Sequence, residues 1–276
     1  MTDHTLLTDL TPVEQVALLA LRLRVLDARS DRPILDDALS AGIADAIGLD
    51  VADTKIPKSI VLVHAVRTTM LDTVVRRFTA RHPDAVVVDL GCGLDPRRQR
   101  CAVPAGVDWY DVDLPALIPL RERYLPPGAH LVGADVTASG WLDEIPRARP
   151  TVIVNDGLMT LLTGADFTAM TQALTRHFTT GELAFHAYSR LAMRNGRRAS
   201  GVVTRGPFSL PSVGEGVDDP HEPERWGARL TLVEEMFLGR APEIALFPPV
   251  LRAIARLGAR STRVSRISDR VLHYRF

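Results

Sequence analysis

The sequence predicts an α/β protein built around a mainly parallel sheet, and three observations lead to this fold class. Short apolar segments alternate with segments of helical spacing between residues 86 and 188, which is typical of βαβ units. The segment 86–95, VVVDLGCGLD, runs from a continuous apolar stretch into a glycine turn, as a buried strand followed by a helix requires. Aspartates follow three later candidate strands, at the sheet edge where open α/β folds bind their ligands.

The opening of the chain is predicted to be helical. Apolar side chains recur at helical spacing in three segments, which are 12–28, 34–47 and 59–81. Thr11 and Glu14 match a capping box at the start of the first segment. His82 ends the third segment, because Pro83 follows and the residue before proline disfavours helix. Residues 1–82 are therefore expected to form a helical cap ahead of the first strand.

The glycine turn has Gly91 and Gly93 on either side of Cys92. Because glycine has no Cβ, the backbone can bend sharply here and lie against a ligand. The third glycine of the dinucleotide fingerprint is missing, which counts against NAD or FAD, and no Gly-Lys-Ser/Thr follows, which excludes a P-loop. Taken alone, the motif fits an ordinary strand-to-helix turn as well as it fits a ligand site.

The rest of the chain continues the alternation and then changes character. Four further strands are predicted at 107–112, 130–134, 151–154 and 182–188, with helices at 114–124 and 166–178. Residues 189–223 are rich in Arg, Gly, Ser and Pro, and they are interpreted as either a lid that faces the substrate or a surface loop. Beyond them, helices are expected at 225–237 and 249–257, and strands at 263–267 and 271–276, joined around Ser268 and Asp269.

Composition excludes several classes of protein. The 276 residues carry a formal net charge of zero and no basic stripe with interleaved aromatic residues, so nucleic acid is not an expected partner. No apolar run reaches the roughly 18 residues of a membrane helix, and no charged-then-apolar leader opens the chain. A cytoplasmic protein without a membrane partner is therefore expected. Cys92 and Cys101, the only cysteines, lack metal-ligand spacing, and no metal site is predicted.

Three carboxylates are candidates for a shared ligand site. Asp113, Asp135 and Asp156 follow successive candidate strands, so their side chains should converge beside the glycine turn. Asp113 lies about twenty residues past the glycines, where a carboxylate can accept hydrogen bonds from both ribose hydroxyls. Asp135 could accept from an exocyclic amine such as adenine N6. Each carboxylate alone could equally be a helix N-cap or a solvated turn residue, but together they form a more specific pattern.

Four segments that contain these residues resemble a known family. VVVDLGCGLD, WYDVDLPALIPLR, LVGADV and IVNDGLM are similar to the motif series of the leucine carboxyl methyltransferases, and most similar to bacterial polyketide O-methyltransferases of the tetracenomycin methyltransferase type. The resemblance runs from about residue 34 to the terminal HYRF. Its most distinctive element is Asp-Leu-Pro after the second strand, since Gly-x-Gly is common to all class I methyltransferases. It implies a Rossmann-like seven-stranded sheet whose last strand is antiparallel, a helical N-terminal cap, and S-adenosylmethionine as methyl donor.

The resemblance also implies roles for individual residues in donor binding. Gly91 and Gly93 would lie against the methionine part of the donor, Asp113 would hold the ribose, and Asp135 with the Val136 backbone would hold adenine. Arg67 matches the family arginine that pairs with the donor's carboxylate, a role that suits a forked guanidinium; the alternative is a helix-surface arginine. Asp156 stands near the donor's amino group, where the family usually has glutamate. Three further residues of these motifs are counted with the donor site: Asp89, Leu114 and Asn155.

Departures from the family fall in the region expected to bind the acceptor. The fifth strand, usually Phe-Asp-Ala-Tyr-Ser, has His186 in place of the aspartate, and Leu161 stands where the family often has tyrosine. A carboxylate acceptor needs no base, whereas a phenol or alcohol would benefit from one. His186, with an ordinary pKa near ~6.5, is the candidate, although it could equally be a structural histidine. Tyr188 could either pack against the acceptor or donate a hydrogen bond to it.

The predicted function is S-adenosylmethionine-dependent O-methylation of a carboxylate or hydroxyl on a small, polyketide-like secondary metabolite. The expected organisation is one domain with a cap (1–82), a donor-binding half (83–188), an insertion (189–235) and a C-terminal sheet portion (236–276). Two alternatives remain open: a protein that binds the donor without methyl transfer, and a cyclase or decarboxylase on the same scaffold. An NAD oxidoreductase is the least favoured reading. The sequence does not predict an oligomeric state.

Overall fold

A seven-stranded sheet organises the protein. The computed structural model describes residues 10–51, 56–195, 213–267 and 269–276. The strand order is β3-β2-β1-β4-β5-β7-β6, and β7 is antiparallel to both of its neighbours, whereas the other pairs are parallel. The strands are β1 Val86–Leu90, β2 Asp108–Asp113, β3 His130–Gly133, β4 Thr151–Asn155, β5 Gly181–Ala187, β6 Thr231–Phe237 and β7 Arg270–Arg275. The predicted fold class, a class I methyltransferase sheet with an antiparallel last strand, is confirmed.

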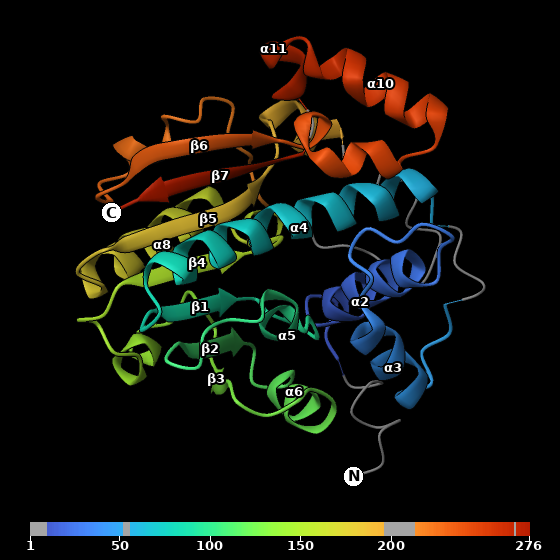
Figure 1. The fold of residues 1–276 in the computed structure, drawn as a ribbon. Coiled ribbons are helices and arrows are strands. Elements are labelled where there is room, and N and C mark those ends of the chain that lie inside the picture. The colour runs from blue at the N-terminus through green and yellow to red at the C-terminus, as the bar shows by residue number, and fades with distance from the viewer. Residues whose placement is uncertain (1–9, 52–55, 196–212, 268) are drawn as a thin grey trace.

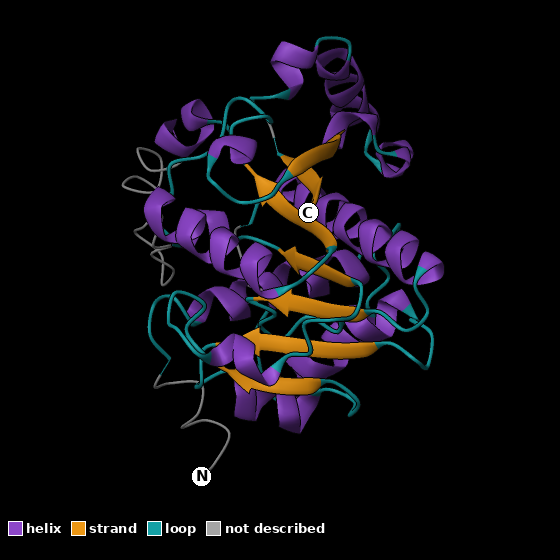
Figure 2. Cartoon of the chain, turned by 90° about the vertical axis from the view of Figure 1, so that its left-hand side faces the viewer, coloured by secondary structure: helices purple, strands orange, loops and turns teal. Residues whose placement is uncertain are grey.

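Helices cover both faces of this sheet (Figures 1 and 2). The α-helices are α2 Gln15–Ala28, α3 Ala38–Ala46, α4 Lys58–Arg81, α5 Arg97–Cys101, α6 Ile118–Tyr124, α7 Leu158–Leu161, α8 Gly164–His177, α10 Pro249–Ala259 and α11 Thr262–Ser265. Short 3-10 helices are η1 Trp141–Glu144, η2 Pro223–Arg225, η3 Leu238–Arg240 and η4 Pro242–Leu246. Among the described residues, no helix combines the length and the apolar character that crossing a membrane requires.

Alternation along β1 divides the core into two layers. Val87 packs with Val74 and Phe78 of α4, whereas Val86 and Val88 belong to the cluster on the opposite face, with Phe167 of α8. Successive side chains of a strand point to opposite faces, so one valine run serves both layers. Because α4 lies along the sheet (Figure 1), it is part of the core, and only α2 and α3 form the predicted helical cap.

The cap sits at the carboxyl ends of β1 and β2, where α2 lies beside α5 (Figure 1). A third apolar cluster joins Leu21 of α2 and Ile43 of α3 to Leu94, directly after the glycine turn, and to Leu120 of α6. The capping box in front of α2 is present: the Thr11 backbone N–H donates to Glu14 Oε2 at 2.7 Å. The cap therefore closes over the ligand edge of the sheet.

Two element predictions in the last third are wrong. Residues 225–237, predicted to be helical, begin at the last residue of η2 and end in strand β6, an edge strand that pairs with β7. Residues 263–267, predicted to be a strand, contain α11, and the Ser261 hydroxyl caps this helix by accepting from the Val264 backbone N–H at 3.4 Å. Strand β6 begins inside the predicted insertion 189–235, so the C-terminal sheet portion starts before residue 236. Part of that insertion, 196–212, lies outside the described residues.

Candidate functional site

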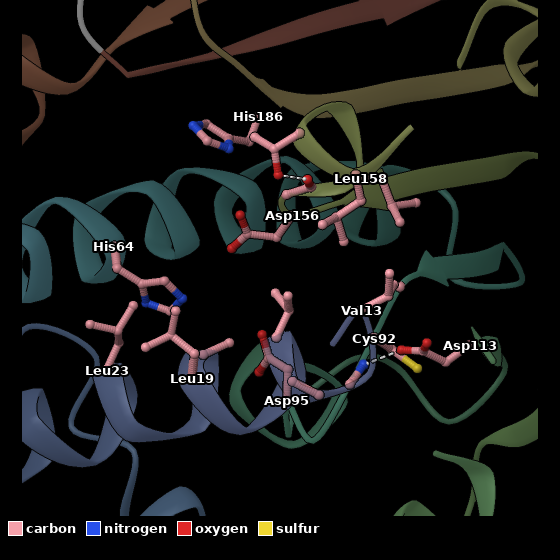
Figure 3. A pocket seen from close by; sticks show the side chains of 18 of the residues that line it. Val13, Leu19, Leu23, His64, Cys92, Asp95, Asp113, Asp156, Leu158 and His186 are labelled. Atoms are coloured by element: carbon pink, nitrogen blue, oxygen red, sulfur yellow. Dashed lines mark hydrogen bonds between the residues drawn. The ribbon is translucent and has the colours of Figure 1, made fainter. Parts of the chain in front are cut away.

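A cavity of about 1100 Å³ opens at the carboxyl ends of β1, β2, β4 and β5. Its walls come from α2, α4, the glycine turn, and the segments that follow β2, β3, β4 and β5 (Figure 3). This is the edge at which the sequence predicted a ligand site. Among the described residues, no group of three His, Cys, Asp or Glu side chains is arranged to hold a metal ion.

The glycine turn is tightly fitted and forms one wall. Gly91 and Gly93 have φ of 65° and 50°, which disfavour residues with a side chain. A Cβ at Gly91 would come within 2.9 Å of the Leu158 side chain, so the absence of a side chain at Gly91 also lets Leu158 pack against the turn. The buried Arg121 of α6 donates to the Gly93 carbonyl at 2.7 Å and holds the turn from behind. Sequence reasoning did not identify this support.

Asp113 braces the same turn and faces the cavity. Its Oδ2 accepts from the Gly93 backbone N–H at 2.6 Å, and its Oδ1 accepts from the Leu114 N–H at 2.7 Å. Burial raises the pKa of Asp113, and these two N–H groups oppose that rise. Each carboxylate oxygen has two lone pairs, so both can still accept from hydroxyls in the cavity. Leu114 lines the cavity as well.

The segment after β3 supplies the predicted adenine end. Asp135 and Val136 both line the cavity. Asp135 is exposed, and its Oδ1 accepts from the backbone N–H and the hydroxyl of Thr137, at 2.8 and 2.7 Å. Oδ2 makes no hydrogen bond among the described residues and is free to accept one from a ligand.

An ion pair stands at the centre of the cavity wall. Arg67 Nε lies 2.7 Å from Asp156 Oδ1, and the Thr68 hydroxyl donates to Asp156 Oδ2 at 3.2 Å. Burial alone would raise the pKa of Asp156, but Arg67, with smaller effects of His64 and His186, lowers it well below its ordinary value. Arg67 is thus not a solvated helix-surface residue. The adjacent opposite charges match those of an α-amino acid, whose carboxylate and ammonium groups are close together.

Two residues predicted for the donor site have other surroundings. Asp89 borders the cavity, but its carboxylate accepts from Arg97 Nε at 2.9 Å, and burial raises its pKa to about 7. This pair belongs to a buried charge network beneath the turn, which also includes Asp72, Asp95 and Arg100. Asn155 is fully buried and is not part of the cavity wall.

His186 and Tyr188 stand at the end of β5, beside a residue that sequence reasoning missed. His186 Nε2 lies 2.8 Å from Asp269 Oδ1, and the Tyr188 ring packs edge-on against the imidazole, with ring centroids 4.3 Å apart. Burial, with a further contribution from the Arg67 charge, lowers the pKa of His186. Burial would raise the pKa of Asp269, but its bond from His186 and the charges of His186 and Arg67 lower it. The available signal for the contact between His186 and Asp269 was the predicted antiparallel last strand, because the start of that strand lies beside the end of β5.

The cap contributes residues that were predicted only as helix core. Leu19 and Leu23 of α2 form an apolar wall, with His64 of α4 beside them (Figure 3). Burial, with Arg67 second, lowers the pKa of His64 to about 3, so this imidazole is neutral at physiological pH. Arg24, also from α2, is buried at the cavity and has Nη2 without a hydrogen-bond partner among the described residues.

Comparisons with known proteins agree with this architecture. The family model for leucine carboxyl methyltransferase matches residues 17–175. The tetracenomycin polyketide synthesis O-methyltransferase TcmP of Streptomyces glaucescens is 35% identical over 269 residues, 97% of this chain and 98% of that protein. The S-adenosyl-L-methionine-dependent methyltransferase dpfgK of Gibberella zeae is 28% identical over 259 residues, 83% of each chain. A solved DUF574 family protein from Streptomyces avermitilis shares the fold, with a TM-score of 0.58 at 14% identity, covering 93% of this chain and 96% of that one.

Proposed function

The chain belongs to the leucine carboxyl methyltransferase family, and we propose on this premise that it transfers a methyl group from S-adenosylmethionine to an oxygen of a polyketide-like small molecule. The near full-length similarity to a polyketide O-methyltransferase supports the substrate class. A cytoplasmic location is part of the same proposal.

The residues present fit the donor. Arg67 would pair with its carboxylate and Asp156 would accept from its ammonium group, since these two side chains already lie 2.7 Å apart. Gly91 and Gly93, which line the cavity, would lie against the methionine chain, and Asp113 would accept from the ribose hydroxyls. When bound, the donor supplies an electrophilic methyl group on a positively charged sulfur. The protein's task is then to position the acceptor oxygen and to exclude water.

The acceptor would lie between the polar wall and the apolar face of the cap. Leu19 and Leu23 give that side of the cavity a surface suited to a flat, largely apolar molecule. His186, neutral because burial and Arg67 lower its pKa, is the candidate general base for a hydroxyl acceptor. Tyr188 borders the same region, and its ring packs edge-on against His186.

One observation carries the donor assignment: a left-handed glycine turn, the ribose-type carboxylate Asp113 and the Arg67–Asp156 pair share one cavity. The test is calorimetric titration with S-adenosylhomocysteine. Asp113→Ala should weaken binding by roughly 10- to 100-fold, because hydrogen bonds to a carboxylate contribute about 1.5–3 kcal/mol. The exposed Asp143→Ala, outside the cavity, is the matched control. Unchanged affinity in Asp113→Ala would refute the site.

Methyl transfer is tested separately. The protein is incubated with donor carrying a deuterated methyl group and a panel of aromatic polyketides that bear hydroxyl or carboxyl groups. A product heavier by one labelled methyl group, formed together with S-adenosylhomocysteine, is the expected result. Conversion of an acceptor without consumption of donor would instead indicate another reaction on this scaffold.

A further inference from the structure

Helix α10 carries an apolar face that is open to solvent. The helix lies with α11 at the end of the molecule beyond β6 (Figure 1). Val250, Ile254 and Leu257 are 71%, 63% and 65% exposed, and none of the 11 residues of the helix is buried. Side chains at these spacings are neighbours on a helix surface, so the three form one ridge along α10.

The opposite side of α10 fixes the helix to the protein. Leu251 and Ala255 are partly buried against the cluster that contains Leu238 and Phe247. Gly239 of η3 passes so close to the helix that a Cβ there would lie 2.8 Å from the Ala255 carbonyl oxygen. Turning the exposed ridge inward would break this packing. The ridge is therefore a fixed feature of the surface.

Helix α11 extends the same apolar surface. Val264 lies beside α10, because a Cβ on Gly258 would be 3.8 Å from Val264 Cγ1, and its side chain is 51% exposed. Single exposed apolar side chains are normal on protein surfaces, whereas a contiguous exposed set marks a surface that binds a partner. The α10 ridge is the set of these four side chains, Val250, Ile254, Leu257 and Val264.

Arginines border the α10 ridge and have no acidic residues among them. Residues 248–267 contain no aspartate or glutamate and five arginines, which are Arg252, Arg256, Arg260, Arg263 and Arg266. The first three recur every four residues, so they lie on one side of α10, and Arg260 is a helix neighbour of Leu257. Arg266 pairs with Glu235, but Arg256, Arg260 and Arg263 are exposed and have no carboxylate partner in the described part of the chain. In a chain of zero formal net charge, this is a local positive surface.

Charge and shape together favour one kind of partner. A second copy of this chain would bring two rows of arginines together, because a two-fold interface joins the same residues. A helix that lies in a membrane surface inserts its whole apolar face, whereas Leu251 and Ala255 of α10 already pack against the protein. An acidic amphipathic helix can lay its apolar side chains on the ridge while its carboxylates reach the arginines. A forked guanidinium binds a carboxylate at two points.

We propose that the α10 ridge and the arginines beside it are a docking surface for an acidic amphipathic helix of another protein. No residue of α10 or α11 lines the cavity. The inference therefore goes beyond the proposed methyl transfer and does not rest on it.

The test uses a defined peptide as the probe, measured by fluorescence anisotropy with the full chain. The labelled peptide has about five helical turns and carries leucine and glutamate at helical spacing. A second peptide has lysine in place of every glutamate. The protein should bind the glutamate peptide with an affinity that falls as salt rises, and it should bind the lysine peptide at least about tenfold more weakly.

Two double variants separate the contributions of charge and of apolar contact. Arg256→Glu with Arg260→Glu should weaken binding of the glutamate peptide about tenfold, because attraction at two exposed pairs becomes repulsion. Ile254→Gln with Leu257→Gln should weaken it by about tenfold as well, because the ridge loses apolar area. All four positions are exposed, so the circular dichroism of both variants should match that of the wild type.

The matched control for charge is Arg147→Glu with Arg176→Glu. Both arginines are exposed and lie outside α10 and α11, and their substitution changes the net charge by the same amount. The affinity for the glutamate peptide should stay within about twofold of the wild type, because charges farther apart than about 8–10 Å are screened. An equal loss in this control would overturn the inference, since the peptide would then respond to net charge alone.

Three further outcomes would overturn the inference. The first is that the wild type binds both peptides equally, or binds neither at millimolar concentration. The second is binding to vesicles of about 30% phosphatidylserine in phosphatidylcholine that Ile254→Gln with Leu257→Gln abolishes, which would assign the ridge to a lipid surface. The third is a dimer in analytical ultracentrifugation that the same two substitutions dissociate, which would assign it to a second copy of the chain.

Discussion

Two clusters of nearly the same chemistry lie at the two ends of the β5–β7 ladder. At the cavity, His186 bonds to Asp269 with Arg67 alongside; at the far end, His273 bonds to Glu182 with Arg81 alongside. Both histidine–carboxylate distances are 2.8 Å, and both arginines belong to α4.

Their surroundings differ much more than their geometry. The Arg67 side chain is 13% exposed and shares two carboxylates, whereas that of Arg81 is 56% exposed and has Glu182 alone. His186 is 1% exposed against 9% for His273. Charges act strongly where water is excluded and weakly where it screens them. The two pairs therefore share one hydrogen-bond geometry, and what distinguishes the first is that it lines the cavity beside a buried arginine.

Removing the two arginines should give the largest contrast. Arg67→Gln leaves Asp156 and Asp269 buried without their cation, and should lower the free energy of unfolding by about 3–5 kcal/mol. Arg81→Gln removes one exposed ion pair and should cost less than about 1 kcal/mol. Urea unfolding at pH 7 measures both. Equal losses would mean that the two clusters do not differ in the way their burial indicates.

The pH dependence of stability should separate the histidine of one cluster from the carboxylate of the other. The pKa of His186 is lowered by burial and Arg67, so below pH ~6.5 the unfolded chain binds more protons than the native one. The His186 contribution to stability should therefore fall as pH drops from 7 to 5, by up to about 1.4 kcal/mol for each unit by which the pKa is lowered. Asp89, whose pKa burial raises to about 7, contributes with the opposite sign over the same range. The pKa of Glu182 is lowered, because the effects of His273 and Arg81 outweigh that of burial. The contribution of Glu182 to stability is therefore lost only below pH ~4.5.

Unfolding free energies measured in steps between pH 5 and 7.5 test this separation. His186→Gln should have a shallower slope than the wild type, whereas the curve of Glu182→Gln should run parallel to that of the wild type. His186→Gln keeps the contribution of His64, whose pKa burial and Arg67 lower to about 3, and the opposite contribution of Asp89, whose pKa burial raises to about 7. The test is therefore the difference in slope from the wild type. A parallel curve for His186→Gln would contradict a buried, neutral histidine at this position.

The sequence predicted the parallel half of the sheet well because its central strands β1 and β4 are buried on both faces and are nearly continuous apolar runs. It failed at β6, an edge strand with a single buried residue, where no alternation marks the strand. Of the site, the sequence indicated the residues at strand ends, such as Asp113. It missed Asp269, which reaches His186 across 83 positions, because only the pairing of β5 with β7 brings them together.

Two tyrosines, one directly after β5 and one in β7, provide the smallest and most selective contrast. The Tyr188 ring packs edge-on against His186 at the cavity, whereas the buried Tyr274 hydroxyl donates to the Pro220 carbonyl at 2.7 Å, away from the cavity. Tyr274→Phe loses this hydrogen bond and should lower the free energy of unfolding by about 1 kcal/mol, whereas Tyr188→Phe keeps its ring contact and should lower it by less.

Only Tyr188→Phe should change kinetics, by about three- to tenfold in kcat, because Tyr188 lines the cavity with His186 and Asp269, whereas Tyr274 does not. The measurements are urea unfolding and steady-state methyl transfer on the same two variants. If both variants lowered kcat equally, the effect would come from loosening of the β5–β7 ladder as a whole. If neither did, Tyr188 would serve packing alone, and the hydrogen bond from His186 would suffice to hold Asp269 in place.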